Sequence, residues 1–224
     1  MLVKNPYDNL KNLILSRLTR IYSKFGKNIT IGQANKYGLR NEIKYIDNIL
    51  DKLIEGTIRD LEKSFLNSQK AIYSDILELF NVNANTPLSK FNMEINFPWS
   101  GLTFDKRLRG VGAKLKSDLI KEITQGIRKR NTLEELLVRV DKTFEKYMKR
   151  IEVIQRVETE HFINIASIYA YKKLKIKRVI WYARIDERTC PVCGDLHEQE
   201  FSVDQIPMIP QHPNCRCRIV PKPD

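Results

Sequence analysis

Four cysteines and two histidines gather between Cys190 and Cys217, and this cluster constrains the fold more than any other feature of the sequence. The chain has only four cysteines in 224 residues, so all of them lie here. The first segment lacks the continuous apolar core of a signal peptide, and we expect a protein kept in a reducing, cytoplasm-like compartment. Clustered thiols in such a compartment bind metal more often than they form disulfides. The cluster therefore predicts a metal site, with zinc as the ion.

The cluster offers more donors than one tetrahedral ion needs. The candidate ligands are Cys190, Cys193, His212, Cys215 and Cys217. The first two cysteines have the spacing of a metal-binding knuckle, and Gly194 follows where we expect a left-handed turn. His197 is a candidate for an alternate ligand or for a side chain that orients a ligand.

Two ligand sets are compatible with the second half of the cluster. If Arg216–Val220 is extended, Cys215 and Cys217 point to the same face, which permits a four-cysteine site. If the chain instead turns at residues 213–214, His212 and Cys215 approach the ion together and one cysteine is spare.

The sequence around the cluster favours a structural ion over a catalytic one. A catalytic zinc needs an open coordination position beside a general base. The cluster contains neither a His-Glu-x-x-His motif nor the His-x-Glu and Pro-Cys-x-x-Cys pair of the zinc deaminases. We therefore expect no enzymatic activity.

The chain before the cluster has the periodicity of amphipathic helices. The predicted helices cover residues 6–25, residues 43–80 as one very long helix or two stacked helices, residues 115–127, residues 133–151 and residues 154–170. Thr132 and Glu135 form a capping box before the fourth of them. Alternating apolar residues predict short strands at Arg178–Arg184 and Arg216–Val220. The predicted fold is mainly α, α+β overall, with long amphipathic helices and a small C-terminal β/zinc-knuckle module.

A segment rich in asparagine and proline, residues 81–101, is typical of a loop or hinge and suggests a domain boundary. We expect an N-terminal helical region at 1–96, a basic helical part at 97–177 and the C-terminal two-strand metal-binding module at 178–224.

The net charge of +12 is concentrated in the middle of the chain, where residues 105–182 hold 20 Lys and Arg against 10 Asp and Glu. Such a segment attracts polyanions such as DNA, although a lysine-rich solvated helix surface gives the same pattern. The predicted DNA-facing residues are Lys114, Lys116, Lys121, Arg128, Lys129 and Arg130.

Several motifs follow one another along the second half of the chain. They are Phe97-Pro-Trp-Ser-Gly-Leu-Thr-Phe104 with Arg107, then Arg156-Val-Glu-Thr-Glu160, Asn164-x-Ala166, Trp181, Asp186-x-Arg188-Thr-Cys190-x-x-Cys193 with Leu196-His197, and His212-Pro-Asn-Cys-Arg-Cys217. In this order they resemble the phage head morphogenesis, or minor capsid, proteins of the phage Mu protein F type. The resemblance covers residues 97–221. Glu198 stands where many relatives have glycine. We also expect Arg156, Glu158 and Glu160 to form ion pairs with Arg184, Asp186 and Arg188.

The resemblance implies a structural virion protein, present in few copies at the portal vertex or inside the head. Its expected partners are the portal protein, the major capsid or scaffolding protein and packaged double-stranded DNA, with no membrane. It would assist procapsid assembly, DNA packaging or DNA ejection, and would lie in the host cytoplasm during assembly. Some relatives carry an enzymatic domain after this module, and since the chain ends at Asp224 we expect none here.

Two other functions remain compatible with the residues. A cytoplasmic nucleic-acid-binding zinc protein would share the basic segment and the cluster. A metal-dependent nuclease or hydrolase would need an open coordination site.

Overall fold

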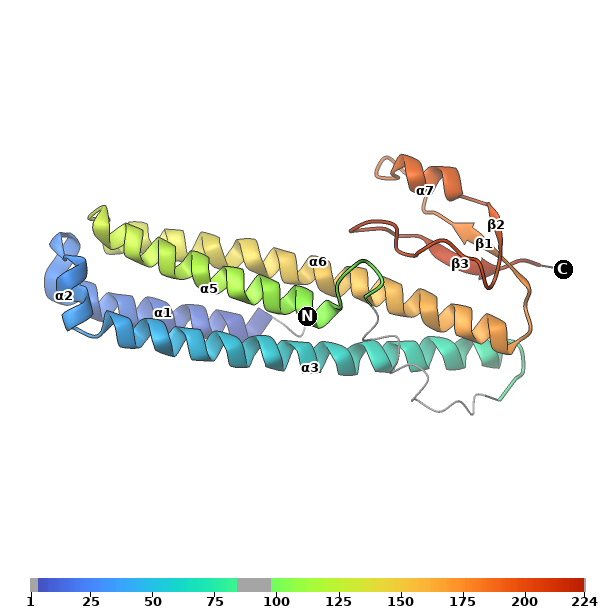
Figure 1. The fold of residues 1–224 in the computed structure, drawn as a ribbon, viewed down its shortest axis with the longest axis horizontal. Coiled ribbons are helices and arrows are strands. Elements are labelled where there is room, and N and C mark those ends of the chain that lie inside the picture. The colour runs from blue at the N-terminus through green and yellow to red at the C-terminus, as the bar shows by residue number, and fades with distance from the viewer. Residues whose placement is uncertain (1–3, 84–97, 224) are drawn as a thin grey trace. The chain divides into compact units, whose positions relative to one another are not determined.

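The computed structural model describes residues 4–83 and 98–223. It is mainly helical with a small C-terminal sheet, which confirms the predicted fold class (Figure 1). The elements are α1 (Lys4–Phe25), the 3-10 helix η1 (Gly26–Asn28), α2 (Ile31–Lys36), α3 (Leu39–Leu79), α5 (Phe104–Arg128), α6 (Leu133–Lys173), β1 (Arg178–Tyr182), α7 (Pro191–Leu196), β2 (Glu200–Ser202) and β3 (Arg218–Pro221). None of the described helices combines the length and the apolar character that crossing a bilayer requires.

The chain divides into two compact units. Unit 1 consists of Met1–Asp60 and Asp105–Glu152, and unit 2 of Leu61–Phe104 and Val153–Asp224. Helices α3 and α6 therefore contribute to both units. The expected boundary between residues 96 and 97 lies outside the described residues, and the one between residues 177 and 178 falls within unit 2.

Unit 1 is built from helices that each bury one apolar stripe. The buried residues include Leu10, Ile14 and Leu18 of α1, Leu50 and Ile54 of α3, Leu115 and Leu119 of α5, and Leu136 and Val140 of α6. Gly112 permits α5 to approach α3 closely, since a Cβ there would lie 2.6 Å from Ile54 Cγ1. Gly126 permits a similar approach to α6, where the same test atom would lie 2.6 Å from Leu136 Cδ1. Small residues at these two positions thus set the spacing of the helices.

The predicted helices differ from the observed ones in two places. The stripes at 133–151 and 154–170 belong to one helix, α6, because Glu152 and Val153 between them do not break a helix. Helix α5 begins at Phe104 rather than Leu115, because Gly110 and Gly112 weaken a pattern that already includes the buried Leu108. The stripe at 43–80 is one long helix, as in the first of the two alternatives.

In unit 2 a three-stranded antiparallel sheet lies beside the cysteine cluster. Its strand order is β2-β1-β3, and Trp181 of β1 is opposite Ile219 of β3. One apolar core joins the sheet to the cluster, and its buried members are Tyr171, Val179, Trp181, Ala183, Cys193, Val203, Ile209, Cys215, Cys217 and Ile219. The three candidate ligands in this core are therefore shielded from water.

The two predicted strands are present but shorter or shifted, since β1 ends at Tyr182 and β3 begins at Arg218. The sequence did not reveal β2, which has only three residues. The expected left-handed turn at Gly194 is wrong, because Gly194 lies within α7. The left-handed residue is Glu198, with a φ of 62°, at the position where the resemblance expects glycine.

Candidate metal centre

The knuckle of the candidate centre is the start of a short helix. Cys190 is the N-cap residue of α7, and its Sγ accepts a hydrogen bond of 3.3 Å from the Cys193 backbone N–H. Pro191 occupies the first turn, where its missing N–H costs nothing. This cap fixes the orientation of the two cysteines of the knuckle relative to each other.

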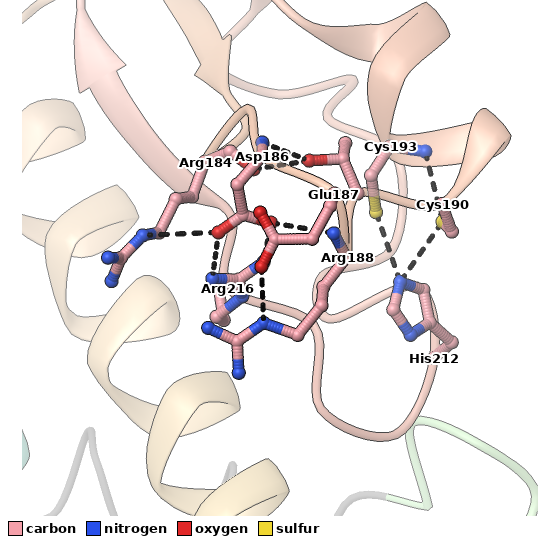
Figure 2. A network of polar contacts seen from close by, with 9 residues as sticks. Arg184, Asp186, Glu187, Arg188, Cys190, Cys193, His212 and Arg216 are labelled. Atoms are coloured by element: carbon pink, nitrogen blue, oxygen red, sulfur yellow. Dashed lines mark hydrogen bonds and ion pairs between the residues drawn. The ribbon is translucent and has the colours of Figure 1, made fainter.

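The second half of the centre brings His212 to the knuckle. Its Nε2 lies 3.1 Å from Cys190 Sγ and 3.2 Å from Cys193 Sγ, as Figure 2 shows. Its Nδ1 lies 2.8 Å from the Pro213 carbonyl oxygen, which can only accept a hydrogen bond. With the proton on Nδ1, Nε2 keeps a lone pair that faces the two sulfurs, as a metal ligand requires.

The remaining cysteines, Cys215 and Cys217, also lie close to the knuckle. Cys193 Sγ lies 3.8 Å from Cys215 Sγ, which is the sulfur–sulfur edge of a tetrahedron with zinc–sulfur bonds of about 2.3 Å. The donor atoms form two groups within 4.8 Å, namely Cys190, Cys193 and His212, and Cys193, Cys215 and Cys217. All five predicted ligands are therefore brought together, and Cys193 belongs to both groups.

The pKa values of the clustered thiols diverge. A hydrogen bond from Cys217 lowers the pKa of the Cys215 thiol to about 5, whereas burial raises that of Cys193 to about 12. The pKa of Cys217 is also raised, chiefly by its hydrogen bond to Cys215 and then by burial. Like charges so close together disfavour one another, so several of these sulfurs ionise together only when a cation lies among them. The donor set thus fits a thiophilic ion such as zinc.

His197 lies outside both donor groups and has a different role. Its Nδ1 accepts a hydrogen bond of 3.2 Å from the Ala183 backbone N–H, and its ring packs edge-on against Tyr182 at 5.0 Å. It therefore fixes the chain where β1 ends.

An ion-paired loop connects the two halves of the centre (Figure 2). The Asp186 carboxylate accepts two hydrogen bonds from the Arg216 guanidinium, at 2.5 and 2.6 Å, and one of 2.9 Å from the Arg188 backbone N–H. Arg216 lies between two candidate ligands in the chain, and Asp186 comes shortly before the knuckle. The guanidinium holds the pKa of Asp186 well below its usual range. This pair therefore fixes the second half of the site against the first.

The expected ion-pair partners are different in the structure. Glu160 pairs with Arg218 rather than with the loop at 184–188, and the Glu158 carboxylate accepts a hydrogen bond of 2.9 Å from Trp99 Nε1. Arg156 is exposed. Side chains alternate between the two faces of the chain around β3. Cys217 is therefore buried in the core, whereas Arg216 and Arg218 on either side of it are only partly buried and can pair with carboxylates.

Helix α6 supports the centre through a row of buried polar residues. Asn164 Oδ1 accepts a hydrogen bond of 3.2 Å from Ile219 N–H, and its Nδ2 donates to the Cys217 carbonyl at 3.3 Å. The Tyr171 hydroxyl donates to the Ile219 carbonyl at 3.1 Å, and His161 Nδ1 lies 2.8 Å from the Ile209 carbonyl. These contacts involve the segments that carry and flank the second half of the site. Sequence reasoning missed this role of Tyr171 and Arg218, although the i, i+3, i+7 spacing from Asn164 places Tyr171 on one helix face.

The predicted DNA-facing residues divide into two groups. Lys114 pairs with Asp118 at 3.4 Å, and Lys116 pairs with Asp47 at 2.7 Å and Asp51 at 3.0 Å. The other four are exposed and form no ion pair with any described residue: Lys121, Arg128, Lys129 and Arg130. Only this second group is available to an anionic partner.

A comparison with known families matches the part of the chain that contains this centre. The family model described as Phage Mu protein F like protein matches residues 117–220, a range that contains the sheet and all five candidate ligands. The match covers a little under half of the chain, so residues 117–220 are similar to the Mu protein F-like family. No curated protein and no solved structure matches the chain.

Proposed function

We propose that the protein is a non-enzymatic minor capsid protein that binds the portal through its helices and contacts packaged DNA through its exposed cations. The Mu F-like segment at 117–220 carries this proposal. The protein would act inside the head or at the portal vertex, during procapsid assembly, DNA packaging or DNA ejection. Its helices would supply the protein-binding surface, and its metal centre would hold the C-terminal module in shape.

A procapsid assembly reaction tests the portal contact. Portal protein is isolated by affinity from reactions with and without this chain, and we expect the chain to co-purify in a fixed ratio. Mass spectrometry of intact virions gives its copy number. Absence from both the isolated portal and the virion would overturn the proposal.

We propose that the ion is zinc in a closed structural site. The donor chemistry supports this, since sulfur and imidazole ligands within a buried core suit zinc. Binding of such an ion contributes to folding free energy, so Cys190→Ser or Cys193→Ser should unfold the C-terminal module. Because Cys193 belongs to both donor groups, its substitution should abolish zinc in either ligand set, whereas His197→Ala should retain one equivalent. Elemental analysis and near-ultraviolet circular dichroism measure the two effects, and a folded, zinc-free Cys193→Ser protein would contradict the idea.

The DNA contact is proposed for Lys121, Arg128, Lys129 and Arg130, which carry no ion pair with the described residues. Arg130 offers a sharp test, because it has a φ of 55° after α5, where glycine is preferred. Arg130→Gly removes a cation without straining the fold. We expect weaker binding to duplex DNA and a salt dependence whose slope falls by about 0.9, the value for one phosphate contact.

A further inference from the structure

A second cationic surface lies at the turn from α6 to β1, within the basic segment 105–182 but apart from the six residues predicted to face DNA. The residues Lys172, Lys173, Lys175, Lys177 and Arg178 follow one another without an intervening acid. This turn borders a hollow of unit 2, which is lined by Lys172, Lys175, Ile176, Lys177, Ser202, Val203 and Asp204. A concave surface with three lysines among its lining residues is suited to an anion.

Ion pairs account for some of these cations and leave others available. Lys172 pairs with Asp204 at 2.9 Å, and Arg178 pairs with Glu200 at 3.1 Å. Lys173, Lys175 and Lys177 are exposed and form no ion pair with any described residue. Three positive charges within five residues thus have no counter-charge among residues 4–83 and 98–223.

The backbone holds one of these lysines in an unusual conformation. Ile176 N–H donates to the Tyr171 carbonyl and Lys175 N–H to the Lys172 carbonyl, which is the pattern of a Schellman motif. Lys175 occupies its left-handed position, with a φ of 60°, where glycine is usual. A favourable interaction with the helix dipole accounts for cations in the last turn of α6, but Lys175 and Lys177 come after that turn. Lys175 and Ser202 both line the hollow.

We propose that this turn binds the phosphate groups of double-stranded DNA, with Lys173, Lys175 and Lys177 as the contacting residues. The lysines act as point charges that neutralise backbone phosphates without reading the base sequence. The inference rests on the proposed contact with packaged DNA, and it adds a site in unit 2 to the one proposed in unit 1. Ser202 accepts a hydrogen bond of 3.4 Å from Asp204 N–H, so its own proton can be donated to a phosphate oxygen.

Glycine at position 175 makes the test independent of folding. Lys175→Gly removes a charge and relaxes the left-handed backbone, so the variant should fold at least as well as the original protein. Lys52→Ala on the exposed face of α3 is the matched control, because it removes the same charge elsewhere. Binding of the full-length, zinc-loaded protein to a fluorescent DNA duplex is followed by anisotropy at several salt concentrations.

We expect Lys175→Gly to bind about eightfold more weakly near 0.1 M salt, with a slope smaller by about 0.9, and Lys52→Ala to match the original protein. Adding Lys173→Ala and Lys177→Ala should lower the slope further. In acetylation footprinting, bound DNA should protect the three lysines and leave Lys52 reactive.

The outcomes separate this site from the proposed function. If Arg130→Gly weakens binding while the triple lysine variant does not, the site at the α6–β1 turn is refuted and the unit 1 contact stands. If only the lysine variants weaken binding, the turn is the DNA site and the unit 1 contact is wrong. If the original protein does not bind duplex DNA, both ideas fail.

Discussion

Substitution of Asn164 tests whether α6 holds the metal-binding module. In the structure Asn164 is 1% exposed, and its amide oxygen accepts the Ile219 N–H. Asn164→Ala leaves that buried N–H without a partner, which costs about 1–3 kcal/mol. The Cys217 carbonyl also loses its hydrogen bond from Asn164 Nδ2, but it keeps one of 3.2 Å from Arg218, so this second loss should cost less free energy than the first. We therefore expect opening of the β1–β3 pair to become easier by about 2 kcal/mol.

Hydrogen–deuterium exchange of peptides that cover β1 and β3 measures this change directly. A loss of about 2 kcal/mol corresponds to about thirtyfold faster exchange where opening is a rapid pre-equilibrium before the exchange step. Ser167→Ala is the matched control on the same helix, because the Ser167 hydroxyl donates only to the Ile163 carbonyl of its own helix. Tyr171→Phe should give a smaller effect of about 1 kcal/mol. Unchanged exchange in Asn164→Ala would refute the idea that α6 holds β3 through its side chains.

Three further predictions concern other parts of the chain. Gly112→Ala should destabilise unit 1 by about 1–3 kcal/mol in a denaturant titration, because the added Cβ overlaps the side chain of Ile54 in α3. Gly110 has open space around it, so Gly110→Ala should instead stabilise the helix by about 0.5–1 kcal/mol. Equal effects of the two substitutions would contradict the close approach of α5 to α3. Glu198→Gly should raise the melting temperature of the C-terminal module, since glycine adopts the left-handed conformation without strain. A lower melting temperature would contradict the claim that Glu198 is strained. The pKa of Asp186 is lowered on folding, so its pairing with Arg216 stabilises the protein above the usual carboxyl pKa of about 4, and this stabilisation is lost as pH falls through the pKa of the folded state. Asp186→Asn should therefore make the free energy of unfolding depend less steeply on pH in the acid range. An unchanged dependence would exclude this pair as its source.

The sequence predicted those features that depend on local pattern. Helical periodicity is strong in α1, α3 and α6, and the five residues that the donor spacing selected lie close together in the structure. Helix ends were less accurate, because the glycines of α5 obscured its first turns and the start of β3 lacks a turn signal.

Features that depend on tertiary contacts could not be read from the sequence. The pairing of Asp186 with Arg216, and of Glu160 with Arg218, is set by the position of β3 beside β1, and nothing in the local sequence distinguishes one arginine from another. The sequence also could not show that Lys116 is neutralised by two aspartates of α3 whereas Lys175 is not. Charge counts identify a basic segment, but only the fold shows which cations are available.

The hydrogen bonds from Asn164 and Tyr171 have a consequence for self-association. The backbone N–H and carbonyl of Ile219 in β3 are both hydrogen-bonded to side chains of α6, so they cannot pair with a strand from another molecule. The opposite edge of the sheet is β2, which has three residues and carries the charged Glu200. Short, charged or covered edges prevent the addition of further strands. The sheet is therefore closed to edge-to-edge aggregation, even where many copies of the protein are concentrated.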